Sequence, residues 1–255
     1  MGNANKILEV TNKKNGPFDD FFKSAFTVDT IIFGFDESNL KVLLIKRGEV
    51  PFANQWALPG NFVYQHEDLE DAAQRVLAEL TGLHDVYLEQ VRTFGKVDRH
   101  PFGRVITVAY YSLVKISSYH LNVSSIAQEA AWYSINQVKE MDLPFDHNEI
   151  FVACFNRLKL NIKRQPIGFE LLPPKFTLTA LQNLYEAILE EKLDKRNFRK
   201  KILSMDFLID LNEFQAGVAH RPAKLYKFDQ DRYKRLYEEE GFHFDVVPSK
   251  NKKNK

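Results

Sequence analysis

The segment Gly60–Leu83, with the sequence GNFVYQHEDLEDAAQRVLAELTGL, decides the fold of the first part of this 255-residue chain. Its apolar side chains recur at helical spacing, which predicts a helix over residues 68–81 with one apolar face. The apolar stripe consists of Leu69, Ala72, Ala73, Val76, Leu77 and Leu80. Gly82 follows the last periodic residue, where a glycine commonly ends a helix. The segment therefore predicts one amphipathic helix that packs on its apolar side.

Apolar runs on both sides of this helix indicate β-strands. The runs cover residues 28–35, 42–45, 105–111 and 130–135. Asp146 and Glu149 have the spacing of a capping box, which predicts a further helix that runs toward Lys163. Because strands and helices alternate, we expect an α/β domain over residues 23–165, preceded by a polar tail over residues 1–22.

The second part of the chain has a different pattern. After a proline-containing connector, apolar residues recur at helical spacing from Leu178, with Thr177 or Thr179 as the N-cap. Asp194 is a good N-cap for a second helix, and residues 221–228 alternate like a strand. Two helices joined by a tight turn and followed by a strand suggest a winged helix-turn-helix. We place this domain at residues 166–245 and a basic, disordered tail at residues 246–255.

The composition limits the class of protein. Hydrophobic residues make up 44% and charged residues 27%, a globular balance that excludes wholesale disorder. The single cysteine excludes a disulfide scaffold and fits a cytoplasmic protein. No apolar run approaches the ~20 residues needed to cross a bilayer, so we expect no membrane partner.

The net charge of +1 conceals an uneven distribution. Residues 1–165 hold 18 basic and 20 acidic side chains, whereas residues 166–255 hold 17 and 14. Residues 195–201, KRNFRKK, carry five positive charges and no acid. The near-neutral total therefore does not exclude a nucleic-acid partner.

The segment Gly60–Leu83 resembles the Nudix box, whose pattern is G-x5-E-x7-R-E-U-x-E-E-x-G-U. The matching positions, after one extra residue behind the first glycine, are Glu67, Arg75, Leu77, Glu79, Gly82 and Leu83. Two glutamates of the pattern are replaced, by Val76 and Leu80. The resemblance implies a Nudix-like α/β/α sandwich in which part of the box has been lost.

The replaced positions are four residues apart and share one face of the helix. In Nudix enzymes this face presents carboxylates to a divalent metal, and Mg²⁺ prefers hard oxygen ligands that valine and leucine cannot supply. We therefore expect no catalytic residues, no metal and no cofactor, and a domain that binds a ligand without hydrolysing it. Two alternatives stay open. One is an active hydrolase with ligands from elsewhere, and the other is an ordinary α/β core.

Several residues are candidates for effector binding. The segment Asp98–Arg104 resembles the aspartate–arginine loop of ADP-ribose-type Nudix proteins, and an arginine there could fork onto a phosphate or bond sugar hydroxyls. Each arginine could equally be a solvated surface charge, and Trp56 could equally belong to the core. The candidate set is Arg47, Trp56, Asn61, Glu79, Asp98, Arg99 and Arg104.

The basic segment 195–201 fits a recognition helix. On a helical wheel Phe198, Ile202 and Met205 form one apolar stripe, and the opposite face presents arginine, asparagine and lysine. Arginine pairs with guanine edges and asparagine with adenine, while flanking basic groups meet phosphates. The DNA-binding candidates are Thr179, Lys195, Arg196, Asn197, Arg199, Lys200, Arg221 and Lys224. The alternative for any basic helix face is plain solvation.

A broken Nudix box followed by the segments 176–187, 194–200 and 221–228 resembles the Nudix-related transcriptional regulators of the NrtR type. The resemblance implies a homodimer whose first domain senses a small molecule and whose winged helix binds a double-stranded DNA operator. One branch of the family responds to ADP-ribose and another to a pentose such as L-arabinose. The segments 75–83 and 89–91 resemble the sugar-responsive branch more, which suggests a role in carbohydrate metabolism. The rival interpretations are a Nudix hydrolase acting on ADP-ribose or a nucleotide sugar, and a protein-interaction module.

Overall fold

The computed structural model describes residues 24–36, 38–84, 86–116, 127–217, 221–239 and 244. The two expected tails, residues 1–22 and 246–255, lie outside the described residues. The first domain contains the strands β1 (Ala25–Phe35), β2 (Leu40–Arg47), β3 (Trp56–Ala57), β4 (Gly60–Phe62), β5 (Tyr87–Phe94), β6 (Val105–Lys115) and β7 (Ala127–Ser134). Its helices are α1 (Leu69–Thr81), α2 (Ile135–Glu140) and α3 (His147–Asn161).

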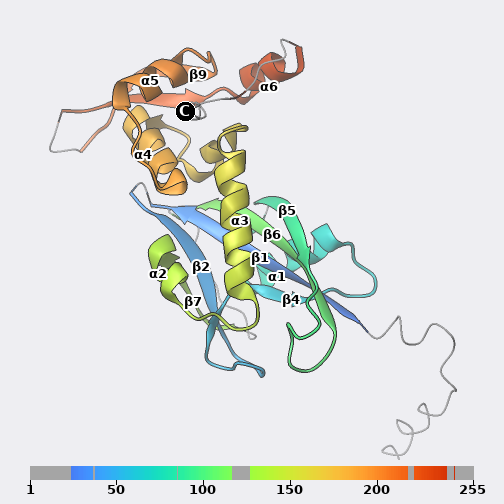
Figure 1. Cartoon of the computed structure of the whole chain (residues 1–255). Coiled ribbons are helices and arrows are strands. Elements are labelled where there is room, and N and C mark those ends of the chain that lie inside the picture. Colours follow the sequence, from blue (N-terminus) through green and yellow to red (C-terminus); the bar gives the residue numbers. More distant parts are fainter. Residues whose placement is uncertain are drawn as a thin grey trace, which may run out of the picture.

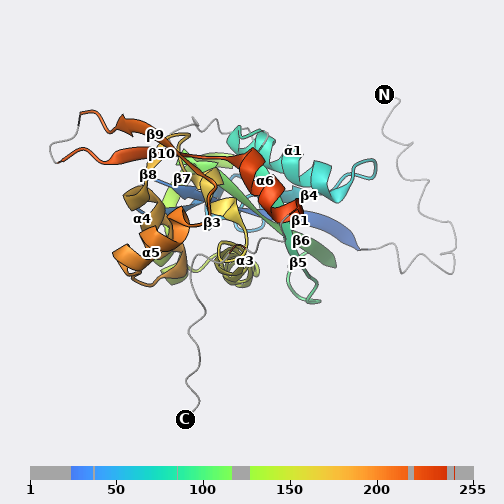
Figure 2. The same ribbon diagram turned by 90° about the horizontal axis from the view of Figure 1, so that it is seen from above.

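These strands form one mixed sheet with the order β3-β2-β1-β6-β5, and β4 and β7 join it beside β1 and β2. The central pair β1 and β6 is parallel, in register from Ala25 opposite Val105 to Phe35 opposite Lys115. Alternate residues of β1 enter different apolar clusters, because Phe33 packs toward α3 while Val28 packs toward α1. Figure 2 shows α1 and α3 on opposite sides of the sheet, which is the expected α/β/α sandwich.

Helix α1 follows the predicted span closely. Gly82 adopts φ 75° and its N–H donates to Ala78 O at 2.8 Å, so the expected glycine cap is confirmed. Val76 and Leu80 are 0% and 1% exposed and pack in one cluster with residues of the sheet. The two positions that depart from the Nudix pattern are thus part of the core.

The start of α3 differs from expectation. Asp146 precedes the helix but makes no side-chain capping bond, and the predicted capping box with Glu149 is wrong. The Asp146 carboxylate bonds to Arg99 instead, and Glu149 pairs with Lys96 at the surface. The physical reason is that a buried guanidinium competes for the carboxylate that would otherwise cap the helix.

The second domain is a winged helix. It comprises the 3₁₀ helix η3 (Pro166–Leu171), β8 (Phe176–Thr177), α4 (Leu178–Leu189), α5 (Lys195–Leu203), β9 (Leu208–Phe214), β10 (Lys224–Phe228) and α6 (Gln230–Glu239). The strands form a three-stranded sheet in the order β8-β10-β9. Thr177 Oγ1 accepts from Ala180 N at 3.0 Å to cap α4, and Asp194 Oδ1 accepts from Asn197 N at 2.8 Å to cap α5.

The two domains share one apolar core. It extends from Phe33 of β1 through Leu158 of α3 to Ile167 of η3 and Leu184 of α4. The segment expected to be a plain connector is thus a buried 3₁₀ turn that joins the domains. Figure 1 shows α3 running along the sheet toward η3 and α4. No helix among the described residues is long and apolar enough to cross a membrane.

Candidate effector pocket and DNA-binding surface

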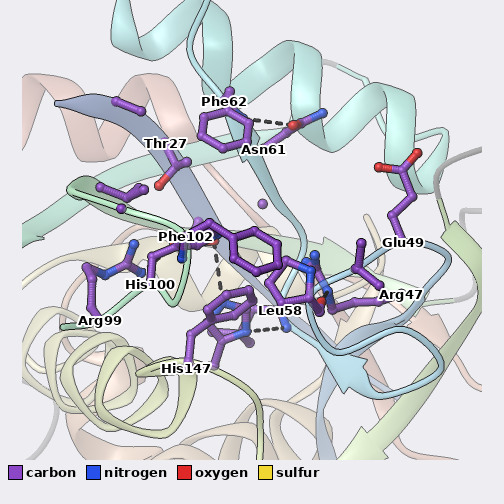
Figure 3. Close-up of a pocket in the computed structure, with 18 of the residues that line it drawn as sticks. Thr27, Arg47, Glu49, Leu58, Asn61, Phe62, Arg99, His100, Phe102 and His147 are labelled. Carbon is purple, nitrogen blue, oxygen red and sulfur yellow. Dashed lines mark hydrogen bonds and ion pairs between the residues drawn. The ribbon is translucent and has the colours of Figure 1, made fainter. Parts of the chain in front are cut away.

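A pocket of about 400 Å³ lies in the first domain, on the face of the sheet opposite α1. Its walls come from β1, β2 and the loop after β2, from β4, from the loop before β6, and from the residues that begin α3. In Figure 3, Asn61 and Phe62 lie on one side of the pocket, and Leu58 and His147 lie on the other. The volume falls in the range of roughly 300–1,000 Å³ that small-molecule sites occupy.

The floor of the pocket is a buried ion-pair network. Arg99 donates from Nε to Asp146 Oδ2 at 2.9 Å and from Nη2 to Asp146 Oδ1 at 2.7 Å. Its Nη2 also lies 3.4 Å from Asp29 Oδ2, and all three residues are less than 9% exposed. Burial alone would lower the pKa of Arg99, but the bonds to Asp146 and the charge of Asp29 raise it. Arg99 is therefore a permanently charged structural element.

Gly60 is required where the backbone meets this floor. A Cβ on Gly60 would lie 1.9 Å from Asp29 Oδ1, a distance that no side chain can occupy. His147 completes the floor, because its Nδ1 accepts from Leu58 N at 3.1 Å and its Nε2 lies 3.7 Å from Asp29 Oδ1. Burial lowers the pKa of His147, so the imidazole is neutral at neutral pH and carries its proton on Nε2.

An aromatic wall lines another side of the pocket. Phe145 has φ 59°, a left-handed conformation that is uncommon for a residue other than glycine. Its ring stacks on His100 at 5.3 Å between centroids and with 10° between planes, and meets Phe52 edge-on at 4.8 Å. Burial and the positive charges of Arg99 and Arg47 lower the pKa of His100. The wall therefore offers flat, uncharged rings to a ligand.

Two further guanidinium groups line the pocket and stay partly exposed. Arg47 donates from Nε to Pro51 O at 2.9 Å, and its Cζ lies 5.1 Å from the Phe145 ring centroid. Arg104 donates from Nη1 to Gly95 O at 2.6 Å. Each bond anchors part of the side chain, and the rest of each guanidinium has donors for a phosphate or hydroxyl.

The polar face of α1 is an ion-pair cluster. Arg75 donates to Glu67 from Nε at 2.8 Å and from Nη2 at 2.6 Å, and to Glu79 from Nη1 at 3.0 Å. The hydrogen bonds from Arg75 lower the pKa of Glu67 to about 2. Both remaining glutamates of the box are thus engaged by one arginine.

The donor set around α1 does not fit Mg²⁺. Magnesium takes six oxygen ligands in near-octahedral geometry, and Val76 and Leu80 offer none. Among the described residues, no group of three or more His, Cys, Asp or Glu side chains could hold a metal ion.

Helix α5 presents its basic side chains outward. Phe198, Ile202 and Met205 are buried, as the helical wheel predicts. Arg196, Asn197 and Lys200 are exposed on the opposite face, and Lys195 is exposed beside the apolar stripe. Figure 1 shows α5 and the β9–β10 hairpin at the end of the molecule away from β4. Helix and hairpin have the arrangement of a recognition helix with its wing.

Three of the DNA-binding candidates already have partners within the protein. Arg199 donates from Nη2 to Thr179 Oγ1 at 2.9 Å, which joins the beginning of α4 to α5. Lys224 pairs with Asp210 across the wing. Arg221 is exposed just before β10. We therefore expect Arg199, Thr179 and Lys224 to contribute by holding the surface in shape as well as by touching DNA.

Comparison with known proteins agrees with both domains. Residues 23–154 match the model of the NUDIX domain, and residues 168–228 match that of the NrtR DNA-binding winged helix domain. The ADPR responsive transcriptional repressor NtrR of Acinetobacter baylyi is 36% identical over 216 residues, which cover 84% of this chain and 86% of that one. The chain belongs to the NrtR family of regulators.

Solved structures of an NrtR protein extend the agreement. Shewanella oneidensis NrtR complexed with a 27mer DNA is 30% identical with a TM-score of 0.73, over 86% of this chain and 97% of that one. Its Nudix domain complexed with ADP ribose is 32% identical with a TM-score of 0.51, over 58% of this chain and 95% of that one. As an NrtR-family member, this chain is a DNA-binding transcriptional regulator with a Nudix domain.

The pocket gathers only part of the effector set expected for this NrtR-family chain. The expected residues that line it are Arg47, Asn61, Arg99 and Arg104. The structure places the other three elsewhere. Trp56 packs against Tyr133 at 5.2 Å, Glu79 pairs with Arg75, and Asp98 is exposed outside the pocket. Strand pairing engages Trp56 and an ion pair with Arg75 engages Glu79, so neither residue lines this pocket.

The pocket residues that the sequence interpretation did not single out include Asp29, His100, Phe145 and His147. A signal existed for Asp29, because a carboxylate inside the apolar run 28–35 must find a partner when it is buried. His100 lies in the arginine-containing loop that the sequence singled out. Phe145 and His147 carried no comparable signal, because their role depends on how the start of α3 meets the sheet.

Proposed function

We propose that this regulator binds ADP-ribose, or a closely related adenosine diphosphate sugar, in the pocket that Phe145 lines. The observation that carries the proposal is the pairing of a flat aromatic wall with the partly exposed guanidinium groups of Arg47 and Arg104. Rings can stack on a purine, and guanidinium forks suit a diphosphate. The printed descriptions of the Acinetobacter relative and of the Shewanella Nudix domain complex support this ligand.

A pentose, which the sequence favoured, fits this pocket less well. A sugar such as L-arabinose could use Asn61 and the arginines for its hydroxyls, but it would bring no aromatic base to the wall of Phe145 and His100 and no anion to the arginines. The relatives described above also name ADP-ribose and not a sugar. We therefore prefer the nucleotide.

We further propose that the exposed residues of α5 read the operator and that the protein acts as a homodimer. A dimer would place two copies of α5 on half-sites separated by about one helical turn of DNA or a multiple of it. A ligand that favours one relative orientation of the two winged helices would then strengthen or weaken their simultaneous contact.

The test compares three candidate ligands on one sample. Operator DNA bound to the full chain is followed by fluorescence anisotropy while ADP-ribose, L-arabinose or ribose 5-phosphate is added. We expect ADP-ribose alone to change operator affinity, at least tenfold at saturation. Sucrose at equal concentration is the control for nonspecific effects. A response to L-arabinose and none to ADP-ribose would overturn the choice of ligand, and no response to any of the three would overturn the sensor role.

The hydrolase alternative rests on the two box glutamates that remain, Glu67 and Glu79. Its test is release of AMP from ADP-ribose in the presence of Mg²⁺ or Mn²⁺, followed by chromatography. Turnover that EDTA abolishes would favour the enzyme. We expect no metal-dependent turnover, because Arg75 holds both carboxylates and the neighbouring positions are apolar.

A further inference from the structure

The turn between α4 and α5 is tied to the Nudix domain by the side chain of Glu190. Its Oε1 accepts from Lys139 Nζ of α2, and its Oε2 accepts from Lys159 Nζ of α3 at 2.5 Å. Both ammonium groups also lie over the buried ring of Phe155, at 5.4 and 4.4 Å from its centroid. We call Glu190, Lys139 and Lys159 the Glu190 bridge. Phe155 supports the bridge from below.

The backbone conformation at Glu190 is unfavourable for a residue that carries a side chain. Glu190 ends α4 with φ 55° and ψ 33°, the left-handed conformation in which helices usually carry glycine or asparagine. A residue with a Cβ costs free energy there that glycine would avoid. Burial would raise the pKa of Glu190, but its bonds to Lys139 and Lys159 lower it overall. The two ion pairs offset the strain and keep the carboxylate charged.

Helix α3 connects the bridge to the effector pocket. Its first residue, His147, lines the pocket, and Asp146 just before it holds Arg99 in the pocket floor. Its last turn carries Lys159, and its 15 residues span about 22 Å at the α-helical rise. Leu158 of the same turn belongs to the core shared by both domains. Figure 1 shows α3 extending from the β7 end of the sheet to the base of α4.

We propose that Glu190 is a positioning residue that couples the effector pocket to the recognition helix α5. Because α3 is one rigid element, a ligand that shifts its first turn also shifts Lys159, and the Glu190 bridge carries that shift into the turn that begins α5. Coupling of this kind needs a continuous chain of contacts between two sites, and α3 with the bridge supplies one. The inference rests on the proposed binding of ADP-ribose in the pocket.

An ion pair that lies within the winged helix serves as a control. Glu213 of β9 pairs with Lys175 at 2.6 Å, and both side chains are about half exposed. This pair resembles the bridge in chemistry but makes no link to the Nudix domain. A general loss of surface charge would act alike on both, whereas loss of coupling would follow only from the bridge.

The experiment compares the coupling ratio, defined as the operator Kd with saturating ADP-ribose divided by the operator Kd without it. In Glu190→Gln we expect the ADP-ribose Kd to stay within twofold of the parent, and the coupling ratio to move at least threefold toward one. Glu213→Gln should leave the ratio unchanged. The triple variant Glu190→Lys, Lys139→Glu, Lys159→Glu, which reverses the polarity of both pairs, should restore it. An unchanged ratio in Glu190→Gln, or an equal loss in Glu213→Gln, would overturn the proposal.

A second measurement does not depend on the ligand. Hydrogen–deuterium exchange of the peptide covering residues 189–195 is compared between Lys159→Gln and Lys175→Gln. We expect exchange at least threefold faster than in the parent for Lys159→Gln and no change for Lys175→Gln. If the parent fails to bind ADP-ribose, the proposed ligand is wrong, and this exchange rate still decides the bridge. No acceleration in Lys159→Gln would overturn it.

Discussion

Helices α1 and α5 are both amphipathic, and each occupies a position where its fold usually holds functional side chains. In α1 two such positions, Val76 and Leu80, are buried, and the glutamates that remain are ion-paired with Arg75. In α5 the apolar stripe is narrow, and Arg196, Asn197 and Lys200 face solvent. Helix α1 is therefore packed as scaffold, whereas α5 keeps its polar face open for a partner.

In the proposed function, the pocket binds the ligand within the first domain. It lies across the sheet from the apolar face of α1 and uses β1, β4 and the start of α3. Its floor is closed by the Asp29–Arg99–Asp146 network, and its wall is open to a ligand. Loss of metal ligands on α1 therefore leaves the pocket intact.

The largest effect on stability is expected when the two glutamates of the Nudix pattern are placed in α1. In Val76→Glu with Leu80→Glu, two carboxylates would enter a fully apolar cluster without a partner, and we expect a loss of more than about 3 kcal/mol in unfolding free energy. Urea unfolding followed by circular dichroism measures it. Gln74→Glu, on the exposed side of the same helix, should cost less than about 0.5 kcal/mol. A stable double variant would mean that this face can still open to solvent.

Loss of the arginine in the pocket floor should lower the unfolding free energy almost as strongly. Arg99→Met leaves Asp29 and Asp146 buried without their cation, and breaking a buried pair in this way costs about 3 kcal/mol or more. The same denaturation experiment measures it. Arg92→Met, at an exposed position of β5, is the matched control. A loss no greater than that of the control would show that Arg99 is not essential to the floor.

A substitution on the exposed face of α5 should weaken DNA binding without changing the stability of the fold. We expect Arg196→Ala to weaken the specific operator by about tenfold to a hundredfold, and random DNA much less, because a base contact carries roughly 1–3 kcal/mol of discrimination. Anisotropy with both duplexes measures the difference. Equal loss on the two duplexes would mean that Arg196 contacts only phosphate. Lys234→Ala on α6 tests whether any lost positive charge has the same effect.

The smallest expected effect is a dependence of stability on pH. The folded pKa of His147 lies below its unfolded value of about 6.5, so its neutral form stabilises the fold above that pH. Acidification below about pH 6.5 should then lower the unfolding free energy, by at most about 1.4 kcal/mol per pH unit for each such histidine. His147→Asn, whose amide oxygen can still accept from Leu58 N, should flatten part of this slope. His100, whose pKa is also lowered, accounts for the rest. An unchanged slope would exclude His147.

Regular elements could be predicted from the sequence because their signals are local. The stripe of α1, the caps of α5 and the apolar runs of β1 and β6 each depend on residues close in the chain. Strand β9 and helix α6 were missed, because β9 alternates weakly and α6 is rich in charge, so neither carries a strong apolar period. The sequence did not reveal the burial of η3, because Pro166 at its start and Pro173 and Pro174 just after it suggested a connector.

The pocket could be predicted only in part because its members converge from distant segments. Arg99 and Arg104 could be predicted from a motif, and Arg47 from its place at a strand end. Phe145 and His147 meet Arg47 and His100 only after α3 has packed on the sheet, so no local pattern reveals them. The Glu190 bridge is another product of packing, since Lys139, Lys159 and Glu190 lie on three different elements.

In the proposed function, the pocket binds ADP-ribose without a metal, and this binding changes the affinity of α5 for the operator. The most direct measurement is an operator titration with ADP-ribose in two buffers, one with Mg²⁺ and one with EDTA, while the nucleotide is followed by chromatography. We expect the same shift in operator affinity in both buffers, with ADP-ribose recovered intact. A shift that occurs only with Mg²⁺ and is accompanied by release of AMP would contradict it.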